Sequence, residues 1–268
     1  MRGLSPMALS RVLRAIAVIF FVASVPARAA DSPAAMAMFE KGDYLAAAKA
    51  AADAGGATNL ALAARATLAD ATLRAAPCLE CLQNAEALAR RAIAADPNNM
   101  EGHIHLAVAL GYQARIIGPI RARFARFPEQ AKEGIETALR LAPNSHWALS
   151  AAGGFNIEVV RSGGRLLGSL LDGASIENGV DYFNRAIDAD RENPLIKLQY
   201  ALALTGYDFD ARRVEITAVL DACTRDMPGN VYEGAMKERA GRLLALLNEN
   251  KRDEYLVLAR RYQGFPDS

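Results

Sequence analysis

One spacing of small residues recurs along this chain and constrains its fold more than any other feature. A small residue is followed four positions later by an apolar or small residue, and three positions after that by a small one, usually alanine. A proline or turn comes about five positions on in most copies. The copies are Ala47, Ala51 and Ala54; Ala85, Ala89, Ala92 and Pro97; Ala131, Ile135, Ala138 and Pro143; Gly179, Phe183 and Ala186; and Ile216, Leu220, Cys223 and Pro228. Residues at this spacing share one helix face, so a second helix can approach that face closely.

The sequence between these copies is also helical in pattern. It is rich in alanine, leucine and arginine, its apolar residues recur at i, i+3, i+4 and i+7, and no convincing run alternates with the period of a strand. A second helix signature follows three of the copies at a constant offset. Its members are His103, Leu106, Ala107 and Leu110; Leu149, Ala152, Gly153 and Asn156; and Lys197, Tyr200, Ala201 and Leu204. The pattern predicts an all-α chain built from stacked antiparallel helix pairs.

These residues resemble the tetratricopeptide repeat (TPR), which has a large residue, Leu-Gly or Leu-Ala, a second large residue and then a small-residue tail. The resemblance covers about residues 35–245. It implies a right-handed α-solenoid of about five TPR-like helix pairs, and we expect the amphipathic helix Asp253–Tyr262 to cap its C-terminal end. Successive tails lie 37 to 48 residues apart, against a TPR period of about 34. Two units therefore carry insertions, around Arg115–Arg126 and Arg161–Ser175. A HEAT-like array, which has a longer period, is the alternative.

Residues 1–29 have the features of a cleavable export signal. Arg2, Arg11 and Arg14 precede an apolar run over 15–24, and Ala27 and Ala29 form a small-x-small cleavage pattern. The run is shorter than the roughly 20 residues that a membrane-spanning helix needs. We therefore expect a signal peptide over 1–29, a TPR-like domain over 30–268 and an exported, periplasmic protein. An uncleaved anchor is the alternative.

The composition and motifs narrow the class of function. A formal net charge of +1 argues against a general nucleic-acid binder. The sequence has no nucleophile–base motif, phosphate-binding loop or metal-ligand cluster, which predicts a non-enzymatic protein with no cofactor, no metal and no evident small-molecule substrate. The favoured function is a scaffold that binds a protein or peptide partner in the cell envelope. An accessory subunit of an envelope enzyme is an alternative.

The TPR resemblance implies a binding groove along the first helix of each pair. The candidate groove residues are Ile104, Val108, Tyr112, Trp147 and Ser150. This lining is mostly apolar and suits an extended or helical apolar peptide. Chaperone-binding TPR proteins carry lysine and asparagine at the fifth and ninth positions, where this chain has Ile104 and Val108, so the resemblance implies that their carboxylate clamp is absent. Packing against neighbouring helices is the alternative role for these side chains.

The two insertions carry arginines in a chain that is net negative once residues 1–29 are removed. These arginines are Arg115, Arg121, Arg123, Arg126, Arg161 and Arg165. If the insertions project from one edge, they form a positive lip that can hold an anionic partner or a membrane surface. A solvated helical face is the alternative.

Cys78 and Cys81 form a C-x-x-C pair in a chain expected to meet an oxidising compartment. The favoured interpretation is a local disulfide that fixes the turn before the second repeat. A redox-active pair and free thiols are the alternatives. Cys223 lies at a repeat-tail position and is expected to pack in the core.

Overall fold

The computed structural model describes residues 32–266, with the side chains of 164–172 excepted. The predicted export signal over 1–29 therefore lies outside the described residues. Within the described range the chain is helical and has no strand, which confirms the all-α prediction. The helices are α1 (Pro33–Glu40), α2 (Tyr44–Ala54), α3 (Ala57–Leu73), α4 (Leu79–Ala95), α5 (Met100–Ile117), α6 (Pro119–Phe124), α7 (Phe127–Leu141), α8 (His146–Asp172), α9 (Ile176–Ala189), α10 (Pro194–Arg225), α11 (Val231–Asn248) and α12 (Arg252–Tyr262).

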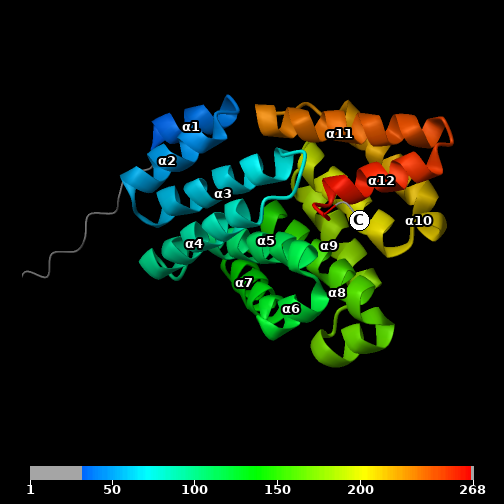
Figure 1. The fold of residues 1–268 in the computed structure, drawn as a ribbon, viewed down its shortest axis with the longest axis horizontal. Coiled ribbons are helices and arrows are strands. Elements are labelled where there is room, and N and C mark those ends of the chain that lie inside the picture. The colour runs from blue at the N-terminus through cyan, green and yellow to red at the C-terminus, as the bar shows by residue number, and fades with distance from the viewer. Residues whose placement is uncertain (1–31, 267–268) are drawn as a thin grey trace, which may run out of the picture.

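The helices pack mainly against their neighbours in sequence, as in a chain of hairpins (Figure 1). The five copies of the small-residue tail lie on α2, α4, α7, α9 and the second half of α10, so each falls on the second helix of a successive pair. The helical residues of the tail are buried in every copy except at Ala54, and the prolines that follow three of the copies are exposed. Their small size allows each second helix to lie close to the first helix of its pair.

Local sequence signals explain where several helices begin. Asn99 accepts a hydrogen bond from the backbone N–H of Gly102 at 2.7 Å and so caps α5. Asn193 caps α10 in the same way, and Pro194 follows it at the first helical position. Between α1 and α2 the backbone turns at Gly42, whose φ of 90° lies in the left-handed region that favours glycine.

The two insertions take different forms. The first becomes the short helix α6, which starts after Gly118 and lies between α5 and α7. The second extends α8 to 27 residues. The fifth unit has no loop between its two helices, because α10 bends at Asp208 instead. Asp208 is non-helical, and its Oδ1 accepts a hydrogen bond from the N–H of Ala211 at 3.0 Å, which caps the second half of the helix.

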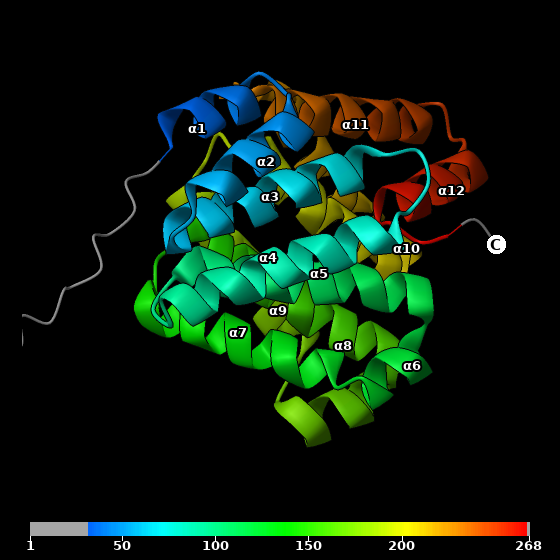
Figure 2. The ribbon, with the colours of Figure 1, turned by 60° about the vertical axis from the view of Figure 1, so that its left-hand side comes forward.

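The last helices return to the first ones. Tyr232 on α11 packs edge-on against Tyr44 and lies 6.5 Å from Phe39, measured between ring centroids. Its hydroxyl lies 3.0 Å from Oγ1 of Thr72 on α3. Arg239 donates a hydrogen bond to the carbonyl oxygen of Thr72 at 2.9 Å. Both views show α11 beside the N-terminal helices (Figures 1 and 2). The helices therefore surround a central space.

Candidate functional site

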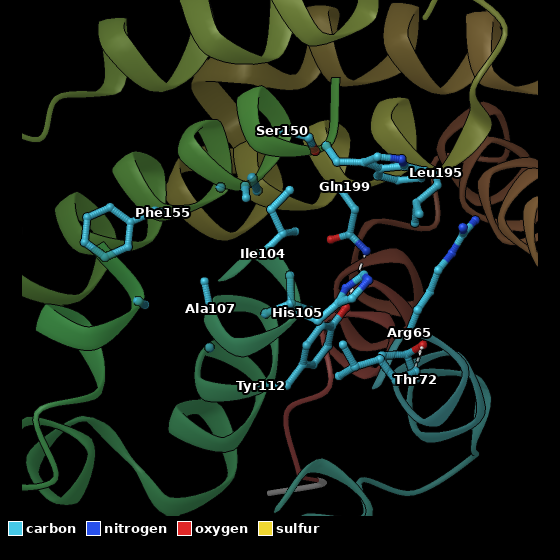
Figure 3. A pocket seen from close by; sticks show the side chains of 18 of the residues that line it. Arg65, Thr72, Ile104, His105, Ala107, Tyr112, Ser150, Phe155, Leu195 and Gln199 are labelled. Carbon is cyan, nitrogen blue, oxygen red and sulfur yellow. Dashed lines mark hydrogen bonds between the residues drawn. The ribbon is translucent and has the colours of Figure 1, made fainter. Parts of the chain in front are cut away.

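The central space holds a cavity of about 260 Å³ whose wall is mostly apolar. Helices α3, α5, α8 and α10 supply most of the wall, and Figure 3 shows their side chains converging on it. The five predicted groove residues all line this cavity: Ile104, Val108, Tyr112, Trp147 and Ser150. The structure thus brings together on one wall side chains that the sequence places on two separate helices.

Arg65 enters this apolar cavity from α3. Its guanidinium lies 4.5 Å from the ring centroid of Phe39 and 5.6 Å from that of Trp147. Both distances suit a cation held against aromatic faces. Arg65 is the single basic residue of α3, a helix that is otherwise mainly alanine, leucine and threonine.

His105 on α5 also lines the cavity. Its Nε2 atom is buried and has no hydrogen-bond partner among the described residues, and the nearest carboxylate oxygen, Oε2 of Glu101, is 4.0 Å away. Burial lowers the pKa of His105 to about 3, and the positive charge of Arg65 adds to this effect. The imidazole is therefore neutral at physiological pH, and it offers a hydrogen-bonding atom rather than a charge.

A polar network around the C-terminal segment forms another part of the cavity wall. Gln263 donates to the carbonyl oxygen of Leu202 at 2.6 Å, and Arg115 donates to the carbonyl oxygen of Gln263 at 2.7 Å. Glu158 accepts from Arg161 at 3.1 Å and lies 3.7 Å from Arg115. Burial raises the pKa of Glu158, but the charges of Arg115 and Arg161 outweigh burial and hold this pKa below its usual range. The carboxylate of Glu158 is therefore ionised, and the two arginines balance its negative charge.

The predicted arginine lip separates into two groups. Arg115 and Arg161 are partly buried, share Glu158 and lie against the ring of Phe265, and Arg115 also lines the cavity. The three arginines on and next to α6 are exposed: Arg121, Arg123 and Arg126. Arg123 lies 2.7 Å from Glu129. The side chain of Arg165 lies outside the described residues.

Cys78 and Cys81 are joined in a disulfide at the start of α4. The backbone N–H of Cys81 points at the Cys78 sulfur, 3.2 Å away. Cys223 is a buried free cysteine, and burial raises the pKa of its thiol to about 12. The Cys223 thiol is therefore uncharged, in keeping with a packing role.

Sequence reasoning missed the polar members of the pocket, above all Arg65 and His105. The sequence did contain a signal for Arg65. This arginine is the single basic residue in a helix made mainly of small apolar residues, and a partly buried charge of this kind requires aromatic or polar neighbours. His105 had no such signal, since its neighbours are brought together by helices that are distant in sequence. Within residues 32–266, no group of three histidine, cysteine, aspartate or glutamate side chains is placed to hold a metal ion. Over the same range, no helix has both the length and the apolar character needed to cross a membrane.

Comparison with known proteins leaves this geometry as the main guide to function. No protein-family model matches the chain, and no curated protein matches it.

Proposed function

We propose that this protein is an exported, non-enzymatic binding protein that holds a short apolar segment of a protein or peptide partner in its central pocket. The observation that carries the proposal is the apolar cavity of about 260 Å³ that is lined by helices from both ends of the chain. Apolar concave sites with a few polar groups are the usual form of a binding site. Because α11 returns to α3, the site suits a compact segment better than a long extended one.

The proposed architecture is a right-handed TPR-like solenoid of about five helix pairs, with α12 as its cap. The placement of five small-residue tails on successive second helices supports this architecture. The proposed location is the periplasm. The arginine-rich, apolar pattern of residues 1–29 supports export, and the Cys78–Cys81 disulfide suits an oxidising compartment.

A displayed library of short peptides tests the binding function. Selection on the protein should enrich peptides with apolar side chains. Trp147 is the single tryptophan of the chain and lines the cavity, so its emission reports directly on occupancy. We expect enriched peptides to change this emission at a stoichiometry of one peptide per chain. Enriched peptides that leave the emission of Trp147 unchanged would argue against the pocket as the binding site.

A second candidate function, peripheral membrane association, is supported by the surface of α6. Ile120 is 74% exposed and Phe124 is 85% exposed. These apolar side chains flank Arg121 and Arg123, and α6 contains no acidic residue. Exposed apolar side chains flanked by arginines suit the interface of an anionic bilayer.

We predict that the full chain sediments with vesicles containing phosphatidylglycerol, and that replacing both Ile120 and Phe124 by serine lowers the bound fraction at least fivefold. The expectation follows from the loss of buried apolar area at the interface. Val214→Ser is the matched control, because Val214 is 86% exposed on α10. Equal sedimentation of the double variant and the control would remove α6 as a membrane contact.

A further inference from the structure

The pocket contains a positive charge that no side chain in the described part of the chain neutralises. Arg65 makes neither a hydrogen bond nor an ion pair with any residue among 32–266, and its contacts are the two aromatic rings. The other arginine of the pocket, Arg115, is paired with Glu158. A guanidinium has five N–H donors in a planar fork that matches a carboxylate. In Arg65 this fork is available to a ligand.

A second unsatisfied polar atom lines the same cavity. The Nε2 atom of His105 is buried without a hydrogen-bond partner within the described range, and leaving such an atom unpaired destabilises the empty pocket. The charge of Arg65 acts on His105, which places the two groups in one electrostatic environment. The imidazole is neutral, and in the tautomer that carries its proton on Nε2 this atom can donate one hydrogen bond. Both groups therefore line one cavity, and each has hydrogen-bonding capacity that no described residue uses.

We propose that the pocket binds its ligand through a single carboxylate, which accepts hydrogen bonds from the guanidinium of Arg65 and from Nε2 of His105. The apolar body of the ligand then lies against the wall that includes Ile104, Val108 and Trp147. This inference rests on the proposed binding function and names the chemistry of the ligand that the pocket takes.

The charges around the cavity favour a carboxylate over a doubly charged phosphate. Of the three glutamates in the wall, only Glu158 forms an ion pair with arginines within the described range. The charges of Glu233 and Arg65 both act on His146. Glu158 is paired with arginines, and Glu233 accepts a hydrogen bond from the N–H of Gly229 at 2.7 Å near the start of α11. Glu101 is the third, and its side chain is 41% exposed. One available cation in a wall that also carries Glu101 and Glu233 suits a ligand with one negative charge better than a ligand with two.

Two sources supply a carboxylate on an apolar body: a free aliphatic acid and the C-terminus of a peptide that ends in apolar residues. Titration of the full chain, followed by the emission of Trp147, separates them. The first arm compares octanoate with octan-1-ol. The second arm compares an acetylated alanine–leucine tetrapeptide with its C-terminal amide. In at least one arm, we expect the acid to bind at least tenfold more tightly than its neutral partner, and that arm identifies the source.

Variants of Arg65 test the recognising group. Arg65→Gln should weaken binding of the acid by about 10- to 100-fold, which is the usual range for a lost charge-assisted hydrogen bond. The same variant should bind the neutral ligand with an affinity within twofold of the parent protein's. Arg65→Lys should restore part of the affinity, because lysine keeps the charge but loses the fork. Arg74→Gln is the matched control, since Arg74 lies directly after α3, is exposed and pairs with Asp70 at 2.8 Å.

The outcomes separate this inference from the proposed function. Equal affinity for acid and neutral ligand in the parent protein would overturn the carboxylate site, and so would an Arg65→Gln variant, folded by circular dichroism, that keeps full affinity for the acid. In both cases, binding of neutral apolar ligands would leave the proposed function intact. If acids and neutral ligands all failed to bind at millimolar concentration, both proposals would fall.

Discussion

Replacing Asp226 by alanine is expected to lower the free energy of unfolding by about 3–5 kcal/mol, because it leaves a buried ammonium group without its counter-charge. Asp226 Oδ1 accepts a hydrogen bond from Lys197, and the two side chains are only 7% and 9% exposed. The ammonium of Lys197 would keep one partner, the carbonyl oxygen of Arg191 at 2.6 Å. The pair joins the start of α10 to the turn after it. Urea unfolding followed by far-UV circular dichroism measures the loss.

Two further variants show whether this effect belongs to the buried pair. The double variant Lys197→Met with Asp226→Leu should recover most of the lost stability, because apolar side chains of similar volume can replace a buried ion pair at little cost. Asp221→Ala should cost less than about 0.5 kcal/mol, since Asp221 and Arg225 form an exposed pair on the same helix. A loss at Asp226 no larger than the loss at Asp221 would contradict this account of α10.

The second large effect is expected at Gly153, where α8 and α9 lie close together. A Cβ atom added at Gly153 would lie 2.6 Å from Cδ2 of Phe183 and 3.0 Å from the carbonyl oxygen of Gly179. Phe183 cannot move away freely, because its ring stacks on Tyr200 with centroids 4.8 Å apart. We predict that Gly153→Ala lowers the free energy of unfolding by about 3 kcal/mol through overpacking.

The neighbouring glycine is the matched control. A Cβ atom at Gly154 would meet only Cζ of Phe183, at the ordinary contact distance of 3.9 Å. Gly154→Ala should therefore raise the free energy of unfolding by up to about 1 kcal/mol, because alanine loses less backbone entropy than glycine when the unfolded chain forms a helix. The midpoints of thermal and urea unfolding should fall for Gly153→Ala and rise for Gly154→Ala. Equal shifts would show that the α8–α9 crossing is looser than described.

The elements of the fold could be predicted from sequence because their causes are local. The tail of Ala85, Ala89 and Ala92 marks a helix face that a second helix approaches, and Asn99 and Asn193 mark helix starts. The five candidate groove residues line one cavity because they recur at equivalent positions on the first helices of two units. Repeats of this kind fix the contacts of each helix with its neighbours.

The closure of the helices could not be predicted in the same way. Contacts such as Tyr232 with Thr72 join helices that are 160 residues apart, and they depend on the sum of many small rotations between successive pairs. The lengthened α8 and the bend at Asp208 add to that sum. Arg65 and His105 line the same cavity only because the helices close in this way.

The most direct test of the enclosed pocket is to fill it without disturbing the fold. Gly111 lies on α5 in the wall of the cavity, and a Cβ atom added there meets nothing within 4 Å. Gly111→Leu should therefore occupy the cavity while stabilising the helix. Gly234→Leu is the control, because Gly234 is also helical and open to a Cβ atom but does not line the cavity.

The measurement is a titration with anilinonaphthalene sulfonate, an apolar anion that fluoresces in apolar sites, read by energy transfer from Trp147. We predict one bound dye per chain in the parent protein and in Gly234→Leu, and at least tenfold weaker binding in Gly111→Leu. Dye binding that is the same in all three proteins, or absent from the parent, would contradict the claim that this pocket is the ligand-binding site of the protein.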